Sequence, residues 1–172
     1  LNKKKIPKKK CLDALNSGFK KSLGLLKNQG VEISFLGGET ADLPDQLETL
    51  DVSGTIHGRV SLSEVITGEE IEKGDLIVGL RSGGKASYEE EKNSGIMCNG
   101  ITLARHSLMK KEYGEKYPEI EGTGIGYYGK FDFDEYLEKL GMTVGEAIIS
   151  PTRLFAPIIQ EMLEAYRPQI SG

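Results

Sequence analysis

The segment with the clearest capacity for chemistry is a glycine- and amide-rich loop that leads directly into a helical pattern. Within residues 93–105 it places Ser94, Gly95, Asn99 and Gly100 just before the apolar positions of the helix. A helix N-terminus presents unpaired N–H groups and partial positive charge, and small residues there let an anion reach the backbone. We therefore predict that these four residues hold a phosphate of substrate or nucleotide. The alternative is structural, with Asn99 as an N-cap and Gly95 as a turn residue.

A second candidate segment follows a short apolar run and consists of Gly37, Gly38, Glu39 and Thr40. Ligands favour the carboxyl ends of strands in α/β sheets, and paired glycines permit close approach of a nucleotide. From the residues alone, we predict that a nucleotide or a second stretch of backbone approaches this segment closely. A strained turn at a domain boundary explains the two glycines equally well.

Other titratable residues give no catalytic assignment. His57 falls in an alternating segment and His106 in a helical one, and neither forms a constellation, so the catalytic residues stay unknown. The carboxylates of residues 89–91 are expected to be solvated, as consecutive acids on a loop usually are. No Walker-type or Rossmann glycine pattern occurs, which argues against the familiar nucleotide folds.

Bulk composition describes an acidic globular protein. The net charge is −4 over 172 residues, which argues against nucleic-acid and membrane-surface partners because both need a basic face. Cys11 and Cys98 have no Cys or His at metal-ligand spacing, so neither a disulfide framework nor a zinc site is predicted. No apolar run approaches the roughly 20 residues of a membrane span. We expect a cytoplasmic protein without a membrane partner.

The elements that must position the two segments form a mixed pattern. Apolar residues at three- and four-residue steps predict a helix over residues 11–28 that ends at Gly30, and a second helix from Asn99 to about Lys111. Ser150 and Pro151 have the types of an N-cap and first residue of a final helix.

Strands are predicted at residues 31–36, 52–60 and 76–80, from apolar runs and from alternation of apolar and polar residues. Residues 43–50 lack periodicity and indicate a linker between domains. The expected fold class is α+β, with a mixed sheet covered by helices.

In their order along the chain, these segments resemble the family of aminoimidazole ribonucleotide synthetases, the phosphoribosylformylglycinamidine cyclo-ligases. Residues 35–42 resemble the family's Gly-Gly-Glu-Thr-Ala-Glu stretch, residues 94–100 its Ser-Gly-x-His-Ser-Asn-Gly loop, and residues 150–155 its Thr-Pro-Thr-Arg-Ile-Tyr helix start. The sequence departs from this pattern at Met97 and Cys98, which replace His-Ser, and in a lengthened loop over residues 81–92.

The resemblance implies a divergent member, truncated at both ends. Residues 1–42 would be the C-terminal end of the N-terminal domain, contributing its last helix and strand. Residues 43–50 would be the linker, and residues 51–172 most of the C-terminal domain. The resemblance also implies that Gly37, Gly38, Glu39 and Thr40 line the interdomain cleft, with Glu39 near the nucleotide or its metal. The N-terminal domain binds ATP and dimerises in this family, and its metal-binding aspartates have no counterpart here. We therefore expect a piece of a longer protein that is inactive alone and has no metal ligands of its own.

The implied activity is the ATP-dependent cyclisation of formylglycinamidine ribonucleotide to aminoimidazole ribonucleotide in purine biosynthesis. The enzyme would be a C–N bond-forming ligase that uses ATP and Mg²⁺ and is a homodimer at full length. One alternative is another ATP-using enzyme of the same superfamily, similar to selenophosphate synthetase or thiamine-monophosphate kinase, although Thr152 and Arg153 favour the synthetase. The other is a non-catalytic interaction module, favoured by the missing aspartates and by Met97 and Cys98.

Overall fold

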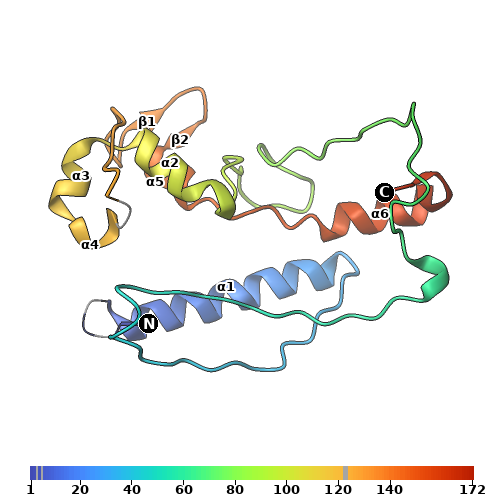
Figure 1. Ribbon diagram of the computed structural model, residues 1–172, viewed down its shortest axis with the longest axis horizontal. Coiled ribbons are helices and arrows are strands. Elements are labelled where there is room, and N and C mark those ends of the chain that lie inside the picture. The colour runs from blue at the N-terminus through green and yellow to red at the C-terminus, as the bar shows by residue number, and fades with distance from the viewer. Residues whose placement is uncertain (3, 5, 122–123) are drawn as a thin grey trace. The chain divides into compact units, whose positions relative to one another are not determined.

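The chain forms two compact units in the computed structural model, which describes residues 1–2, 4, 6–121 and 124–172 (Figure 1). The first unit joins Leu1–Gly79 to Leu154–Gly172, and the second is Leu80–Arg153. The linker predicted at residues 43–50 lies inside the first unit. The assignment of residues 1–42 to a separate domain stays a prediction.

The long helix of the first unit is α1, Lys8–Asn28, drawn in blue in Figure 1. It confirms the predicted helix and begins a few residues earlier than expected. Gly30 adopts φ 81° and donates its N–H to the carbonyl of Lys27 at 3.0 Å, while the N–H of Val31 donates to that of Leu26 at 2.9 Å. This pair of bonds is a Schellman motif, which satisfies terminal carbonyls and needs a residue that tolerates positive φ. The role predicted for Gly30 is confirmed.

The other regular elements of the first unit are short. They are the 3₁₀ turns η1, Leu62–Glu64, and η3, Arg167–Gln169, and the helix α6, Ala156–Tyr166. The predicted start of this last helix was wrong. Ser150 instead follows the helix α5, Val144–Ile149, as its C-cap residue, and its hydroxyl accepts the N–H of Ser94 at 3.1 Å. The helix α6 begins only at Ala156, with Phe155 in the N-cap position.

The strands predicted at residues 31–36, 52–60 and 76–80 are wrong for this chain, since the described residues there form no ladder. Most of their apolar side chains stay exposed, with Leu36 at 92%, Ile56 at 74% and Ile77 at 100%. Alternation marks a face for burial, but a strand exists only where a neighbour pairs its N–H and C=O groups. No such neighbour is present among the residues that the structure describes. The α+β class holds in coarse form, with a two-stranded sheet where a larger mixed sheet was expected.

The second unit contains most of the regular structure. Its elements are η2, Cys98–Gly100; α2, Ile101–Leu108; α3, Lys111–Lys116; α4, Pro118–Glu121; β1, Tyr136–Leu137; β2, Met142–Thr143; and α5, Val144–Ile149. The strands pair antiparallel, with Tyr136 opposite Thr143 and Leu137 opposite Met142. The helix predicted from Asn99 to about Lys111 ends earlier, because Met109 and Lys110 leave the helical path to form parallel bridges with Phe131 and Gly129.

The core of the second unit is built around α5, which packs beside α2 and β2 (Figure 1). Its buried cluster consists of Met109, Tyr127, Val144 and Ile148. A capping box fixes the start of α5. The N–H of Glu146 donates to the hydroxyl oxygen of Thr143 at 3.1 Å, and the N–H of Thr143 donates to the Glu146 carboxylate at 2.7 Å. The helix is thereby held at both its apolar face and its N-terminus.

Two substitutions within α5 test this core. Val144 is 0% exposed, and Val144→Ala should lower the free energy of unfolding by about 2 kcal/mol because the removed methyl groups leave a cavity. Ile149 lies on the same helix but is 69% exposed, so Ile149→Ala should change it by less than about 0.5 kcal/mol. Chemical denaturation of both variants measures the difference. Equal losses would show that α5 does not pack through Val144.

Candidate functional site

The predicted phosphate-binding residues lie in an irregular segment of the second unit, residues 81–100, which we call the glycine loop. Within this loop, Gly84 and Asn93 pair through their backbones, and we call this pair the neck. Gly84 donates its N–H to the Asn93 carbonyl at 2.9 Å, and Asn93 donates to the Gly84 carbonyl at 2.7 Å. Residues 85–92 therefore form a closed excursion whose two ends are held together.

The glycine loop is docked on residues 147–153, the end of α5 and the stretch that follows it, which we call the anchor segment. The side-chain amide of Asn93, a residue only 8% exposed, donates to the Pro151 carbonyl at 2.6 Å. Its amide oxygen accepts the N–H of Gly95 at 2.9 Å. Asn93 therefore joins the neck, the next turn and the anchor segment through one side chain.

Further bonds continue this docking toward the start of α2. Ser94 donates its hydroxyl to the Ala147 carbonyl at 2.8 Å, and the same oxygen accepts the N–H of Ile96 at 3.1 Å. The N–H of Cys98 donates to the hydroxyl oxygen of Thr152 at 2.9 Å. The loop is thus bound to the anchor segment at successive points along its length.

Arg153 is the most highly connected side chain at the site. Its Nε and Nη2 atoms donate to the two carboxylate oxygens of Glu89 at 2.7 and 2.8 Å. Nη2 also donates to the Gly84 carbonyl at 3.0 Å, and Nη1 donates to the carbonyls of Arg81 and Gly83. One guanidinium therefore binds both the tip of the excursion, at Glu89, and residues 81–84, which lead into it.

This ion pair is largely withdrawn from water, with the side chains of Arg153 and Glu89 exposed by 5% and 13%. The hydrogen bonds from Arg153 lower the pKa of Glu89, and the bonds to Glu89 raise the pKa of Arg153. Both groups are consequently held in their charged forms. Two buried charges are tolerated only as a pair with further hydrogen bonds, and the three backbone carbonyls supply those bonds.

The backbone donors predicted to hold phosphate are largely engaged already, either within the loop or with the anchor segment. The N–H of Ser94 donates to Ser150, that of Gly95 to Asn93, and that of Gly100 to the Met97 carbonyl at 2.9 Å. Asn99 is exposed and lies within η2, so its side chain is open to solvent. Phosphate binding by these residues stays a prediction, and Asn99 is the one whose side chain faces outward.

The structural alternative for this loop is confirmed at one residue and wrong at the other. Asn99 does not cap α2, since Gly100 occupies the N-cap position and no side chain caps it there. Gly95 is a turn residue with φ 89°. A Cβ on Gly95 would lie 3.3 Å from the backbone of Gly83, so the loop needs glycine there both for its conformation and for its close approach.

The second predicted segment, Gly37 to Thr40, lies in the first unit. All four of its residues are exposed and belong to no helix or strand. The next residue, Ala41, accepts the amino group of Leu1 at 3.0 Å through its carbonyl. The structure therefore gives this segment an open surface, and its place on an interdomain cleft with Glu39 near a nucleotide stays a prediction.

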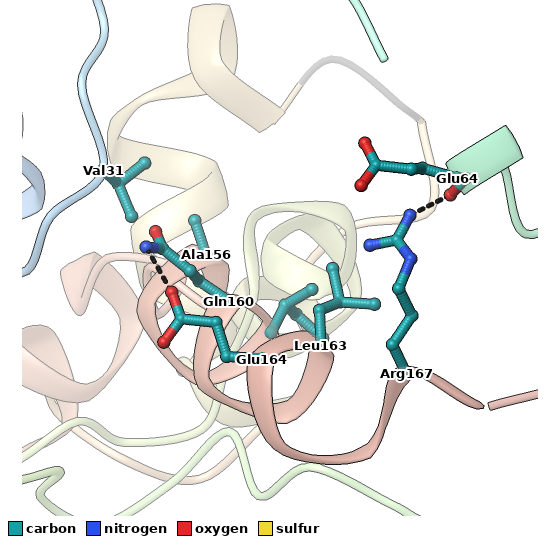
Figure 2. A pocket seen from close by; sticks show the side chains of 8 residues that line it. Val31, Glu64, Ala156, Gln160, Leu163, Glu164 and Arg167 are labelled. Carbon is teal, nitrogen blue, oxygen red and sulfur yellow. Dashed lines mark hydrogen bonds between the residues drawn. The ribbon is translucent and has the colours of Figure 1, made fainter. Parts of the chain in front are cut away.

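The first unit also carries a surface hollow of about 500 Å³, which sequence reasoning did not indicate (Figure 2). It is lined by Val31, Glu64, Ala156, Ile159, Gln160, Leu163, Glu164 and Arg167. Two hydrogen bonds join groups of its lining: Gln160 donates to the Glu164 carboxylate at 3.0 Å, and the Arg167 guanidinium donates to the Glu64 backbone carbonyl. The hollow brings together no pair of groups suited to acid–base or nucleophilic chemistry.

Sequence reasoning missed the pairing of Glu89 with Arg153. The carboxylates of residues 89–91 were expected to be solvated, and this is wrong for Glu89 because an arginine far away in sequence folds back onto it. The available signal was a run of three acids within a lengthened loop, together with the arginine of residues 150–155.

His106, for which the sequence offered no catalytic partner, is buried in the second unit. It is 4% exposed, its Nδ1 atom lies 2.8 Å from the Gly126 carbonyl oxygen, and its ring meets that of Tyr127 edge-on. A carbonyl oxygen only accepts hydrogen bonds, so Nδ1 carries the proton.

The described ranges contain no group of three or more His, Cys, Asp or Glu side chains placed to hold a metal ion. Nor does any helix in them have the length and apolar character needed to cross a membrane.

Comparison with known proteins identifies relatives that are named as enzymes of one kind, although no protein-family profile matches the chain. A protein of Methanocaldococcus jannaschii named phosphoribosylformylglycinamidine cyclo-ligase is 32% identical over 84% of this chain and 34% of its own length. A protein of Methanobrevibacter smithii with the same name is 34% identical over 78% of this chain and 32% of its own. A third protein with this name, from Methanococcoides burtonii, is 32% identical over 90% of this chain and 39% of its own length.

The chain thus spans about a third of the length of the curated relatives that it matches. Over most of its own length it is a divergent relative of proteins that carry this one name.

A substitution pair within the loop tests its backbone requirement. Gly95→Ala should destabilise the loop by about 1–2 kcal/mol, because an L-residue is strained at positive φ. Gly100 has φ −101° and no atom within 4 Å of a built Cβ, so Gly100→Ala should be tolerated. Amide hydrogen exchange at Gly84 and Asn93 reports the neck in both variants. Full protection of the neck in Gly95→Ala would contradict the conformation described here.

The ion pair predicts an acid-sensitive loop. The folded-state pKa of Glu89 is below its ordinary value of 4.5, so the pair's contribution is complete above that pH and is lost as pH falls through the lowered value. Exchange protection at the neck should therefore drop in acid. Glu89→Gln removes the charge and should abolish this pH step. Glu115→Gln, at an exposed pair with Lys111 in the same unit, should retain it.

Proposed function

We propose that the protein containing this chain is a phosphoribosylformylglycinamidine cyclo-ligase, which forms aminoimidazole ribonucleotide in purine biosynthesis. One observation carries the proposal: over 78–90% of this chain, relatives at 32–34% identity share that name. The reaction is assigned to the complete protein, because the chain spans about a third of its relatives.

The proposed reaction makes a carbonyl oxygen into a leaving group. ATP, a substrate, transfers its terminal phosphoryl group to the formyl oxygen of formylglycinamidine ribonucleotide. A nitrogen of the substrate then attacks the same carbon, the new C–N bond forms, the C–O bond breaks and phosphate leaves. One proton is released as the ring closes. Such chemistry depends on positioning and on stabilising phosphoryl charge, so it needs no nucleophilic side chain from this chain.

The part proposed for this chain is to hold a phosphate at the exposed end of the glycine loop. The side chain of Asn99 points to solvent there, beside the start of α2. The N–H of Ser94, bonded to Ser150 of the anchor segment, and that of Gly95, bonded to Asn93, fix the loop's shape. In this proposal Asn99 contacts the phosphate, while Ser94, Gly95 and Gly100 give the loop the conformation that presents it.

Glu39 is proposed to lie beside the nucleotide or its Mg²⁺ ion. Proteins usually hold Mg²⁺ through one or two carboxylates together with substrate phosphates, and the ion supplies positive charge to the phosphoryl group. An exposed single carboxylate such as Glu39 fits a share of that coordination. Since no cluster of candidate ligands gathers in the described part of the chain, the other ligands are proposed to come from the rest of the protein.

The exposed apolar segments fit a chain that is completed by other residues. Residues 52–60 and 76–80 have strand-like patterns but no strand partner among the residues described. We propose that residues outside this chain pair with them in a homodimeric complete protein. A cyclo-ligase is favoured over an enzyme similar to selenophosphate synthetase or to thiamine-monophosphate kinase. The reason is that the relatives compared share the name of the cyclo-ligase.

The direct test is product formation by the complete protein. With ATP, Mg²⁺ and formylglycinamidine ribonucleotide, mass spectrometry should detect aminoimidazole ribonucleotide and ADP in equal amounts. Asn99→Ala should raise KM for one phosphate-bearing substrate about tenfold through loss of a charge-assisted hydrogen bond. Asn16→Ala, at an exposed site on α1, is the matched control and should change nothing. Glu39→Gln should weaken ATP use. Absence of product from wild type would overturn the proposed function.

A further inference from the structure

We propose that Arg153 is a positioning residue that, through Glu89, holds the glycine loop in its phosphate-binding conformation. The inference rests on the proposed function in one respect, namely that this loop receives a phosphate. It concerns residues that touch the loop and not the reacting atoms.

The first argument is the way the five hydrogen bonds of Arg153 are distributed. Two go to the Glu89 carboxylate at the far end of the excursion, and three go to carbonyls of residues 81, 83 and 84 at its entry. The guanidinium therefore fixes the distance between the tip and the entry of a segment that has no regular structure. A contact with only structural importance at one point would join Arg153 to a single short stretch, whereas these bonds reach both residues 81–84 and Glu89.

The second argument is chemical. Glu89 also accepts the N–H of Ala86 at 2.7 Å through the oxygen that binds Nη2, so the carboxylate organises the tip as well. A planar guanidinium presents donors along two edges, which lets Arg153 serve the carboxylate and the carbonyls together. A lysine ammonium keeps the charge but has no such fork. The geometry therefore predicts that lysine cannot replace Arg153.

The third argument links this clamp to the ligand end of the loop. Arg153 follows Thr152, whose hydroxyl oxygen accepts the N–H of Cys98 beside Asn99. Pro151, the next residue back, accepts the side-chain amide of Asn93. Freeing Arg153 would release the anchor segment at the point where it holds both the neck and the start of η2. Asn99 would then lose its fixed position.

The test uses the complete protein as wild type, Arg153→Lys, Glu89→Gln and the control Glu115→Gln. Cys98 is exposed and adjoins Asn99, so its alkylation rate, followed on its own peptide by mass spectrometry, reports the ligand end of the loop. The rate is measured with and without inorganic phosphate. Steady-state kinetics with ATP and formylglycinamidine ribonucleotide varied separately gives kcat and each KM. A thermal unfolding curve confirms that each variant is folded.

In wild type and Glu115→Gln, phosphate should slow the alkylation of Cys98. In Arg153→Lys and Glu89→Gln this protection should be lost, and KM should rise about tenfold for the substrate whose phosphate the loop holds, with a smaller change in kcat. A rise for the ribonucleotide alone identifies its phosphate as the ligand, and a rise for ATP alone identifies the nucleotide.

Either of two results would overturn the inference. One is folded Arg153→Lys with wild-type phosphate protection and both KM values unchanged. The other is no phosphate protection of Cys98 in wild type, which would show that the loop holds no phosphate. If wild type forms no aminoimidazole ribonucleotide but phosphate still protects Cys98 in a way that depends on Arg153, the proposed reaction fails and the positioning role stands.

Discussion

The candidate site depends on one interaction, the paired charges of Arg153 and Glu89 beneath the surface of the second unit. Each charge alone would be costly to withdraw from water, so neither residue holds its place without the other. Together with three carbonyls they convert a loop of irregular backbone into a defined conformation. We infer that the pair acts mainly on which conformation the loop adopts, since the net stabilisation from a buried ion pair is often small.

The ion pair can hold the loop in place only because α5, to which the loop is also bonded, has a fixed position. The capping box at Thr143 and the buried Val144 fix the helix, and its last turn offers the Ala147 carbonyl and the Ser150 hydroxyl to the loop. Two of the contacts from the loop to the anchor segment end on backbone carbonyls, at Ala147 and Pro151. Those two positions therefore need the right backbone path more than a particular side chain.

Sequence reasoning succeeded where structure is local. The apolar spacing of α1 and the glycine after it were sufficient, because the helix and its C-terminal motif are determined within a few residues. It failed for residues 52–60 and 76–80, whose alternation describes a buried face but cannot supply the partner strand. It also missed α5, whose six residues are too few for a helical period to emerge.

The candidate site was found only in part, for the same reason. Composition drew attention to Gly95 and Asn99, and the turn at Gly95 is present. The contacts that shape the loop join residues more than fifty positions apart, such as Asn93 with Pro151 and Glu89 with Arg153. A single sequence carries no local mark of such pairs. The roles of Ser94 and Gly95 in bonding within the loop were therefore invisible before the structure.

The neck between Gly84 and Asn93 has a consequence for how the loop can vary. The neck already joins residues 84 and 93. Extra residues inserted at the exposed Glu91 would therefore lengthen a closed segment and leave the contacts between the glycine loop and the anchor segment in place. Loop-closure entropy grows slowly, by about 0.6 kcal/mol for each doubling of length. Natural insertions, or an engineered peptide tag, should therefore be accommodated there at little cost, provided that Glu89 keeps its reach to Arg153.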